Sequence, residues 1–186
     1  MICDLADDVV ITGKGTLGLV NAGLINTGSG DDNLQGSATE QGGVGLLNVG
    51  TINTGAGNDL ITGKGTVGLV NAGLIDTGAG NDTVDAFTGG FAGSGTIDLG
   101  AGHDELRGFG NGHFSGGEGI DTLTFKAGTY SIESKSLNSG HYAIAMVGDT
   151  SGAVMYVSGF ERFGSGANQH NFLTSALSPA HQVVFF

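Results

Sequence analysis

The sequence predicts an all-β chain that folds as a parallel β-solenoid with a C-terminal β cap. Three observations lead to this prediction: a long segment repeats, glycine recurs every few residues, and aliphatic residues align when the repeats are stacked. ITGKGTLGLVNAGLINTGSGDD (11–32) returns as ITGKGTVGLVNAGLIDTGAGND (61–82), and QGGVGLLNVGTINTGAGND (41–59) lies between them. Such repeats are typical of stacked units that each pack against their neighbours. With 38 glycines and β-branched residues in the apolar positions, the repeats favour strands over helices.

The repeats define the positions that we expect to stack in successive coils about 4.8 Å apart. Aliphatic columns would form a continuous core, and one asparagine column would form a hydrogen-bonded ladder with a structural role. The predicted aliphatic columns are Ile25, Ile52, Ile75 and Ile97; Leu34, Ile61, Val84, Leu106 and Leu123; and Leu19, Leu46 and Leu69, and the asparagine column is Asn21, Asn48 and Asn71.

Two regions follow from where the repeats end. Residues 1–124 are predicted to form the solenoid. In residues 125–186 the pattern changes, because LTFKAGTYSIES and HYAIAMV alternate apolar residues with polar or small ones. That alternation predicts antiparallel or closing strands with Tyr142, Ile144 and Met146 on one face. A solenoid needs a cap at its open end, and we assign this role to the second region.

The segment GKGTLG (13–18) fits the glycine pattern of a dinucleotide-binding loop. That loop must lie between a strand and a helix, whereas the following LVNAGLINTG is rich in glycine and asparagine. The second copy, GKGTVG (63–68), is what a structural repeat produces. We therefore interpret GKGT as a corner of each coil, where glycine would provide a positive φ.

Composition excludes several classes of partner. With 18 acidic and 6 basic residues the net charge is −12, so nucleic acids and anionic membranes are poor partners and cations are better ones. The single cysteine, Cys3, cannot form an internal disulfide framework. No apolar run reaches the ~18 residues of a membrane span, and MICDLADDVV does not have the pattern of a cleaved signal peptide.

The most specific repeat is a six-residue turn, Thr-Gly-x-Gly-x-Asp, with an apolar residue two positions after the aspartate. It occurs three times in this form and twice with Leu99 or Gly116 in place of the threonine, and the distance between successive copies decreases from 27 to 17 residues. Asp7 or Asp8 would belong to a further, incomplete copy. If the coils stack, the aspartates lie about 5 Å apart and repel each other by roughly 3 kcal/mol per pair at an effective dielectric constant of ~20. The five predicted column members are Asp32, Asp59, Asp82, Asp104 and Asp121.

A divalent cation between adjacent turns would convert this repulsion into attraction. Calcium fits best, because it takes 6–8 oxygen ligands, accepts backbone carbonyls and tolerates irregular geometry. Magnesium requires a stricter octahedron, and zinc prefers cysteine or histidine. The glycines would let each turn direct its carbonyls toward one point.

The turn resembles the RTX, or hemolysin-type, nonapeptide G-G-x-G-x-D-x-U-x of calcium-binding β-rolls. Residues 116–124, GGEGIDTLT, match it throughout, and the resemblance covers roughly residues 27–124. It implies calcium held by the aspartates and turn carbonyls, and export from bacteria by type I secretion with a signal near the apolar end VVFF (183–186). The implied metal-site residues are Thr27, Ser29, Asp32, Thr54, Ala56, Asp59, Thr77, Ala79, Asp82, Leu99, Ala101, Asp104, Gly116, Glu118 and Asp121.

One departure from that family changes the expected site. A regular β-roll coil carries two nonapeptides, whereas each coil here carries one turn and a longer Gly/Asn/Leu segment. We therefore expect calcium along one edge only, with about four ions between five turns. The function expected is that of a secreted, non-enzymatic calcium-binding module that folds on binding Ca²⁺.

Other interpretations remain open at this stage. An outward row of Thr27, Thr54 and Thr77 would suit binding to ice, a polysaccharide or a cell surface. A β-helix enzyme acting on polysaccharides, or a non-catalytic module of one, is a further alternative. His103 and His113 are the candidates for a transition-metal or catalytic pair, although turn-surface positions are expected for both.

Overall fold

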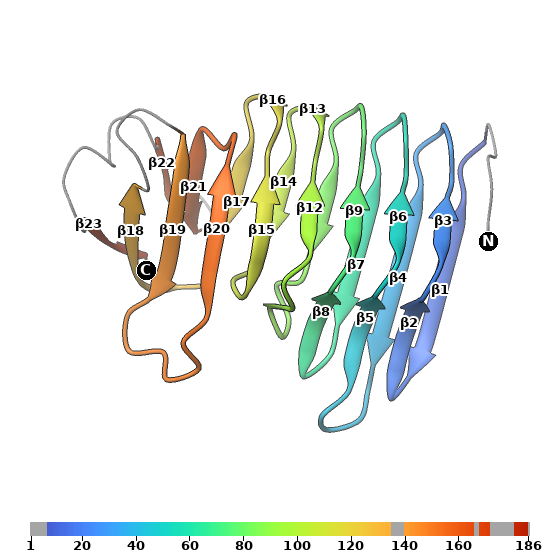
Figure 1. Cartoon of the computed structure of the whole chain (residues 1–186), viewed down its shortest axis with the longest axis horizontal. Coiled ribbons are helices and arrows are strands. Elements are labelled where there is room, and N and C mark those ends of the chain that lie inside the picture. Colours follow the sequence, from blue (N-terminus) through green and yellow to red (C-terminus); the bar gives the residue numbers. More distant parts are fainter. Residues whose placement is uncertain (1–6, 135–139, 166–167, 172–180, 186) are drawn as a thin grey trace.

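The computed structural model describes residues 7–134, 140–165, 168–171 and 181–185. Strands and turns wind into successive coils that lie side by side along the long axis of the molecule (Figure 1). No helix occurs in these residues, and therefore none that is long and apolar enough to cross a membrane. The predicted fold class, an all-β parallel solenoid, is confirmed. Cys3 and Phe186 lie outside the described residues.

Three parallel sheets form the walls of the solenoid, and each of the first four coils contributes one strand to each sheet. The first sheet is β1 (Val10–Gly15), β4 (Asn33–Ala38), β7 (Leu60–Lys64), β10 (Thr83–Asp85), β14 (Glu105–Arg107), β17 (Thr122–Thr124) and β21 (Arg162–Ser165), with β22 (Asn168–Asn171) added antiparallel. The second is β2 (Leu17–Asn21), β5 (Val44–Asn48), β8 (Val67–Asn71) and β11 (Phe91–Ala92). The third is β3 (Leu24–Asn26), β6 (Thr51–Asn53), β9 (Leu74–Asp76), β12 (Thr96–Asp98), β15 (Gly112–Ser115) and β20 (Val154–Ser158), followed by β19 (His141–Met146), β18 (Gly128–Ser134) and β23 (His181–Phe185).

The predicted aliphatic columns are confirmed by the strand register. Ile25 pairs with Ile52, Ile52 with Ile75, and Ile75 with Ile97, and all four are buried. The column that begins at Leu34 and the one that begins at Leu19 are also in register. Because each coil places the same side chain above the previous one, the core continues through the stack.

The asparagine column forms the predicted ladder. The side-chain amide of Asn21 donates to the side-chain oxygen of Asn48 at 2.8 Å, and the amide of Asn48 donates to that of Asn71 at 2.9 Å. Each side-chain oxygen also accepts the N–H of the glycine two residues later. These buried groups are therefore satisfied within the fold, as a structural role requires.

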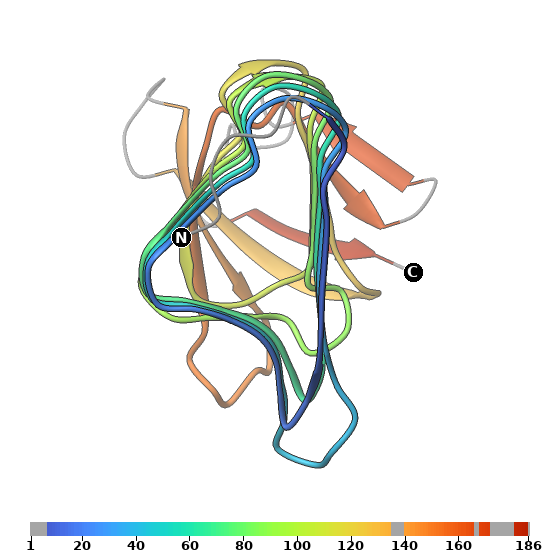
Figure 2. The same cartoon turned by 90° about the vertical axis from the view of Figure 1, so that its right-hand side faces the viewer.

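Among the glycines of the two GKGT corners only Gly15 has a positive φ, at 157°, so the predicted positive φ is not a repeated feature of this corner. Gly13 and Gly63 lie within strands, and neither has a positive φ. A Cβ on Gly13 would lie 2.0 Å from the carbonyl oxygen of Gly18, and one on Gly63 would lie 2.2 Å from that of Gly68. The glycines therefore let the first and second sheets meet at the narrow end of the coil, seen at the bottom of Figure 2.

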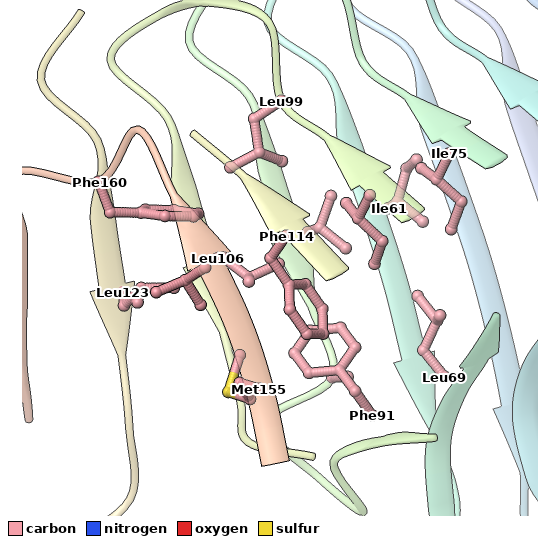
Figure 3. Close-up of a cluster of buried hydrophobic side chains, with 14 of the residues drawn as sticks. Ile61, Leu69, Ile75, Phe91, Leu99, Leu106, Phe114, Leu123, Met155 and Phe160 are labelled. Atoms are coloured by element: carbon pink, nitrogen blue, oxygen red, sulfur yellow. The ribbon is translucent and has the colours of Figure 1, made fainter. Parts of the chain in front are cut away.

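The later coils are shorter because they lose this narrow end. β11 has only two residues, and the next coil crosses directly from β14 to β15 without a strand in the second sheet. Aromatic side chains fill the core there, with the rings of Phe91 and Phe114 packed edge to face at 5.1 Å (Figure 3). Toward the C-terminus the core thus changes from aliphatic columns to aromatic contacts.

The C-terminal strands close the solenoid as predicted. β18, β19 and β20 pair antiparallel, and Ile144 is buried while Tyr142 and Met146 pack against the core. β20 also pairs in parallel with β15, and β21 pairs in parallel with β17. The parallel stacking therefore continues past residue 124, through β20 and β21.

Equivalent glycines in successive coils provide a test of this close stacking. A Cβ on Gly50 would lie 2.1 Å from the carbonyl oxygen of Gly23, whereas a Cβ on Gly23, in the first coil, would meet nothing within 4 Å. We expect Gly50→Ala to lower the free energy of unfolding by ~1–3 kcal/mol. The matched control Gly23→Ala should be neutral or stabilising by ~0.4–1 kcal/mol. Denaturant unfolding would measure both, and equal effects would contradict the stacking.

Candidate metal centre

The repeated turns connect the third sheet to the first and lie along one edge of the solenoid, at the top of Figure 1. Each turn contains two glycines with positive φ, for example Gly55 at 99° and Gly57 at 136°. Such values are strained for residues with a Cβ. These turn positions therefore favour glycine.

Every turn ends in a buried aspartate, and the five stack in one column, as predicted. Their exposed fractions are between 0 and 2%. In the last four, the carboxylate oxygen Oδ1 accepts the backbone N–H of the aspartate in the preceding coil, at 2.7–2.8 Å. We call Asp32, Asp59, Asp82, Asp104 and Asp121 the aspartate column.

The second oxygen, Oδ2, has no hydrogen-bond partner in any of the five carboxylates, although all five atoms are buried. Within the part of the chain that the structure describes, no lysine or arginine pairs with the aspartate column; the ion pairs of Arg107 are with Asp85 and Glu105. An unpaired buried charge is costly, and a structure retains one only when something compensates it. The regular row of unpartnered oxygens is therefore a place where a proton, a water molecule or a cation would be favourable.

Burial raises the pKa of Asp59, Asp82, Asp104 and Asp121. The pKa of Asp82 rises to about 6, with burial the largest cause and the charge of Asp59 a smaller one. The N–H of Asp59 and the nearby hydroxyl of Thr77 oppose that shift, although the proton of Thr77 is donated to the carbonyl of Leu99 at 2.7 Å.

Asp104 has a pKa of about 7, and the first residue of its turn differs from that of the Asp82 turn. Burial is again the largest cause, opposed by the N–H of Asp82 and reinforced by the charges of Asp121 and Asp82. Here Leu99, fully buried, occupies the position of Thr77. No hydroxyl therefore lies beside this carboxylate to favour its charged form.

The first residues of the turns point inward. Thr27, Thr54 and Thr77 are 0% exposed, and the hydroxyls of the first two donate to the carbonyls of Thr54 and Thr77. The alternative that these threonines form an outward row for ice or a polysaccharide is therefore wrong. A buried hydroxyl is tolerated at this position because a backbone carbonyl of the next coil accepts its hydrogen bond.

The third residues of the turns lie side by side in successive coils. Ser29, Ala56, Ala79 and Ala101 form a row of parallel bridges, and Ala101 pairs with Glu118 through the short strands β13 (Ala101–Gly102) and β16 (Glu118–Gly119). The carbonyls of Ala56, Ala79 and Ala101 accept the N–H of the fourth-position glycine in the preceding coil. These predicted carbonyl ligands therefore already bond to a neighbouring coil, and each keeps one lone pair for a cation.

A second row of side chains, not predicted from the sequence, runs along the outside of the turns. Asp8, Asp31, Asn58 and Asn81 each accept the backbone N–H of the equivalent residue in the next coil, at 2.6–2.9 Å. His103 continues it, because its Nδ1 accepts the N–H of Ile120 at 3.0 Å. His113 instead stacks on Tyr156, so the two histidines belong to different surfaces.

The ends of the aspartate column hold two residues that sequence reasoning missed. At the N-terminal end, the N–H of Val9 donates to Asp32, so Val9 takes the column position and Asp8 the outer row. At the C-terminal end, the N–H of Asp121 donates to Oε2 of Glu161 at 2.8 Å. The sequence does contain a signal for Glu161, because an apolar residue, Phe163, follows it two positions later, as in the repeated turns. Phe163 pairs with Leu123 of the apolar column.

No group of three or more His, Cys, Asp or Glu side chains converges on one point in the described ranges. Each interval between coils brings together two carboxylates at most, so backbone carbonyls and water would complete the shell of any cation there. Magnesium and calcium accept such oxygen ligands, and zinc does not favour them.

The stacked coils and the repeated turns along one edge define a β-solenoid with a buried column of carboxylates. No family model matches the chain, and no match was found among the curated proteins or the solved structures.

Proposed function

We propose that this chain is a non-enzymatic calcium-binding module of the RTX type, in which Ca²⁺ lies between successive turns and stabilises the stack. One observation carries the proposal: every member of the aspartate column has a buried oxygen without a partner. The donor set fits a hard cation, because each interval offers carboxylate and carbonyl oxygens and no nitrogen or sulfur ligand is required.

Electrostatics explain why a divalent ion suits this column better than protons do. Carboxylates about 4.8 Å apart repel each other by roughly 3 kcal/mol at an effective dielectric constant of ~20. Protonation removes this repulsion at pH values below the raised pKa values of Asp82 and Asp104, about 6 and about 7. At higher pH the two carboxyls lose their protons and the repulsion returns. A cation with two charges offsets two neighbouring carboxylates at any higher pH.

The proposed role is structural. Without metal, self-repulsion and the entropy of the glycine-rich turns oppose folding, and bound calcium supplies the missing free energy. Calcium sites in extracellular modules commonly have dissociation constants of about 10⁻⁴–10⁻³ M. We further propose that the module works outside a bacterial cell after type I secretion and folds when it meets that calcium.

The number of bound ions tests the proposal. The aspartate column encloses four intervals, so isothermal titration calorimetry of the parent chain should count at least four calcium ions. Asp82 borders two intervals, and Asp82→Asn should therefore lower the count by two. A parent chain that binds no calcium at millimolar concentration would overturn the proposal.

A further inference from the structure

The aspartate column continues into the C-terminal region through a residue that lies outside the repeated motif. The N–H of Asp121 donates to Oε2 of Glu161, as the N–H of Asp104 donates to Oδ1 of Asp121. The N–H groups of Glu161 and Arg162 in turn donate to the carbonyl of Asp121, at 3.2 and 3.0 Å. The bond from Arg162 is equivalent to the one from Thr122 to the carbonyl of Asp104 in the preceding coil, so Glu161 takes the column position.

The length of the side chain accounts for glutamate at this position. The preceding turn runs from Ser115 at the end of β15 to Asp121, whereas the last turn runs from Ser158 at the end of β20 only to Glu161. The last turn is therefore three residues shorter. The additional methylene of glutamate brings a carboxylate back to the column from this tighter turn.

A second observation points to a ligand in this interval. Asp121 is 0% exposed, and its Oδ2 has no hydrogen-bond partner. Gly116 packs closely against two oxygens: a Cβ there would lie 2.2 Å from the carbonyl oxygen of Gly159 and 2.8 Å from Oδ2 of Asp121. A carbonyl oxygen and an unpartnered carboxylate oxygen thus both lie beside Gly116, and the carboxylate of Glu161 accepts the N–H of the same aspartate.

We propose that Asp121, Glu161 and the carbonyl of Gly159 hold a further calcium ion that fastens β20 and β21 to the solenoid. The inference rests on the proposed function, because it extends the same column by one interval. Its consequence is distinct: calcium would stabilise the docking of the C-terminal strands as well as the repeats.

The test compares Glu161→Gln with Glu133→Gln, which removes the same charge from an exposed position on β18. Glutamine retains an oxygen that can accept the N–H of Asp121, so the fold should persist, and far-ultraviolet circular dichroism in calcium would verify this. We expect Glu161→Gln to bind one calcium ion fewer than the parent by calorimetry, and Glu133→Gln to bind the same number.

Hydrogen exchange provides an independent readout. In the parent, calcium should slow exchange of the amides in residues 154–165 at least tenfold, and in Glu161→Gln this protection should be lost while that of β6 and β9 remains. An unchanged ion count with unchanged protection of residues 154–165 would overturn this inference and leave the proposed function standing. A parent chain that binds no calcium would instead overturn both.

Discussion

Replacing Asp59 and Asp82 together with asparagine is expected to remove most of the stability that calcium provides. The two residues border three of the four intervals of the aspartate column. One ion at a hundred times its dissociation constant contributes ~2.7 kcal/mol, so the loss of three ions corresponds to ~8 kcal/mol. Thermal unfolding at several calcium concentrations would measure the effect as a much smaller rise of Tm with calcium than in the parent.

The same variant should behave differently in chelator. Asparagine removes two buried charges but keeps the oxygen that accepts the neighbouring N–H, so without calcium the variant should be no less stable than the parent. Asp31→Asn is the matched control, because Asp31 lies in the exposed outer row, where Asn58 and Asn81 occupy the same position. Its calcium dependence should equal that of the parent. Should the double variant retain the ion count and the calcium-dependent Tm, the aspartate column is not the metal site.

Without divalent cations, the free energy of unfolding is expected to fall as pH rises from about 4 to about 7. Burial raises the pKa of Asp82 to about 6 and of Asp104 to about 7, so the folded state binds more protons than the unfolded state in this window. The stabilisation is therefore fully present below the ordinary aspartate pKa of ~3.9 and is lost as pH passes the folded values. For Asp104 alone the change amounts to ~4 kcal/mol.

Denaturant unfolding at several pH values in chelator would measure this dependence. With calcium present, the free energy of unfolding should rise with pH, because the metal binds the deprotonated carboxylates and so binds more tightly as pH rises. Asp149→Asn is the control: Asp149 is exposed, and its pKa is lowered by hydrogen bonds from Ser151, so it titrates below the window. A stability in chelator that increases from pH 4 to pH 7 would contradict the assignment.

The sequence by itself determined the solenoid and the columns inside it. Repetition of the same motif places Ile25, Ile52 and Ile75 above one another, because similar coils stack in register. The same argument located the asparagine ladder and the aspartate column. Spacing was sufficient for these features because each depends on equivalent positions in neighbouring repeats.

Only the tertiary structure decided what lies across a coil and at its ends. The close approach of Gly13 to Gly18 depends on the distance between the first and second sheets. The inward direction of Thr27 depends on a hydrogen-bond acceptor in the next coil. Glu161 joins the column from a shorter turn after the chain has passed through two antiparallel strands. A repeat pattern does not show which way a side chain points, and it carries no information on contacts such as that of Asp121 with Glu161, which join positions that are not equivalent in the sequence.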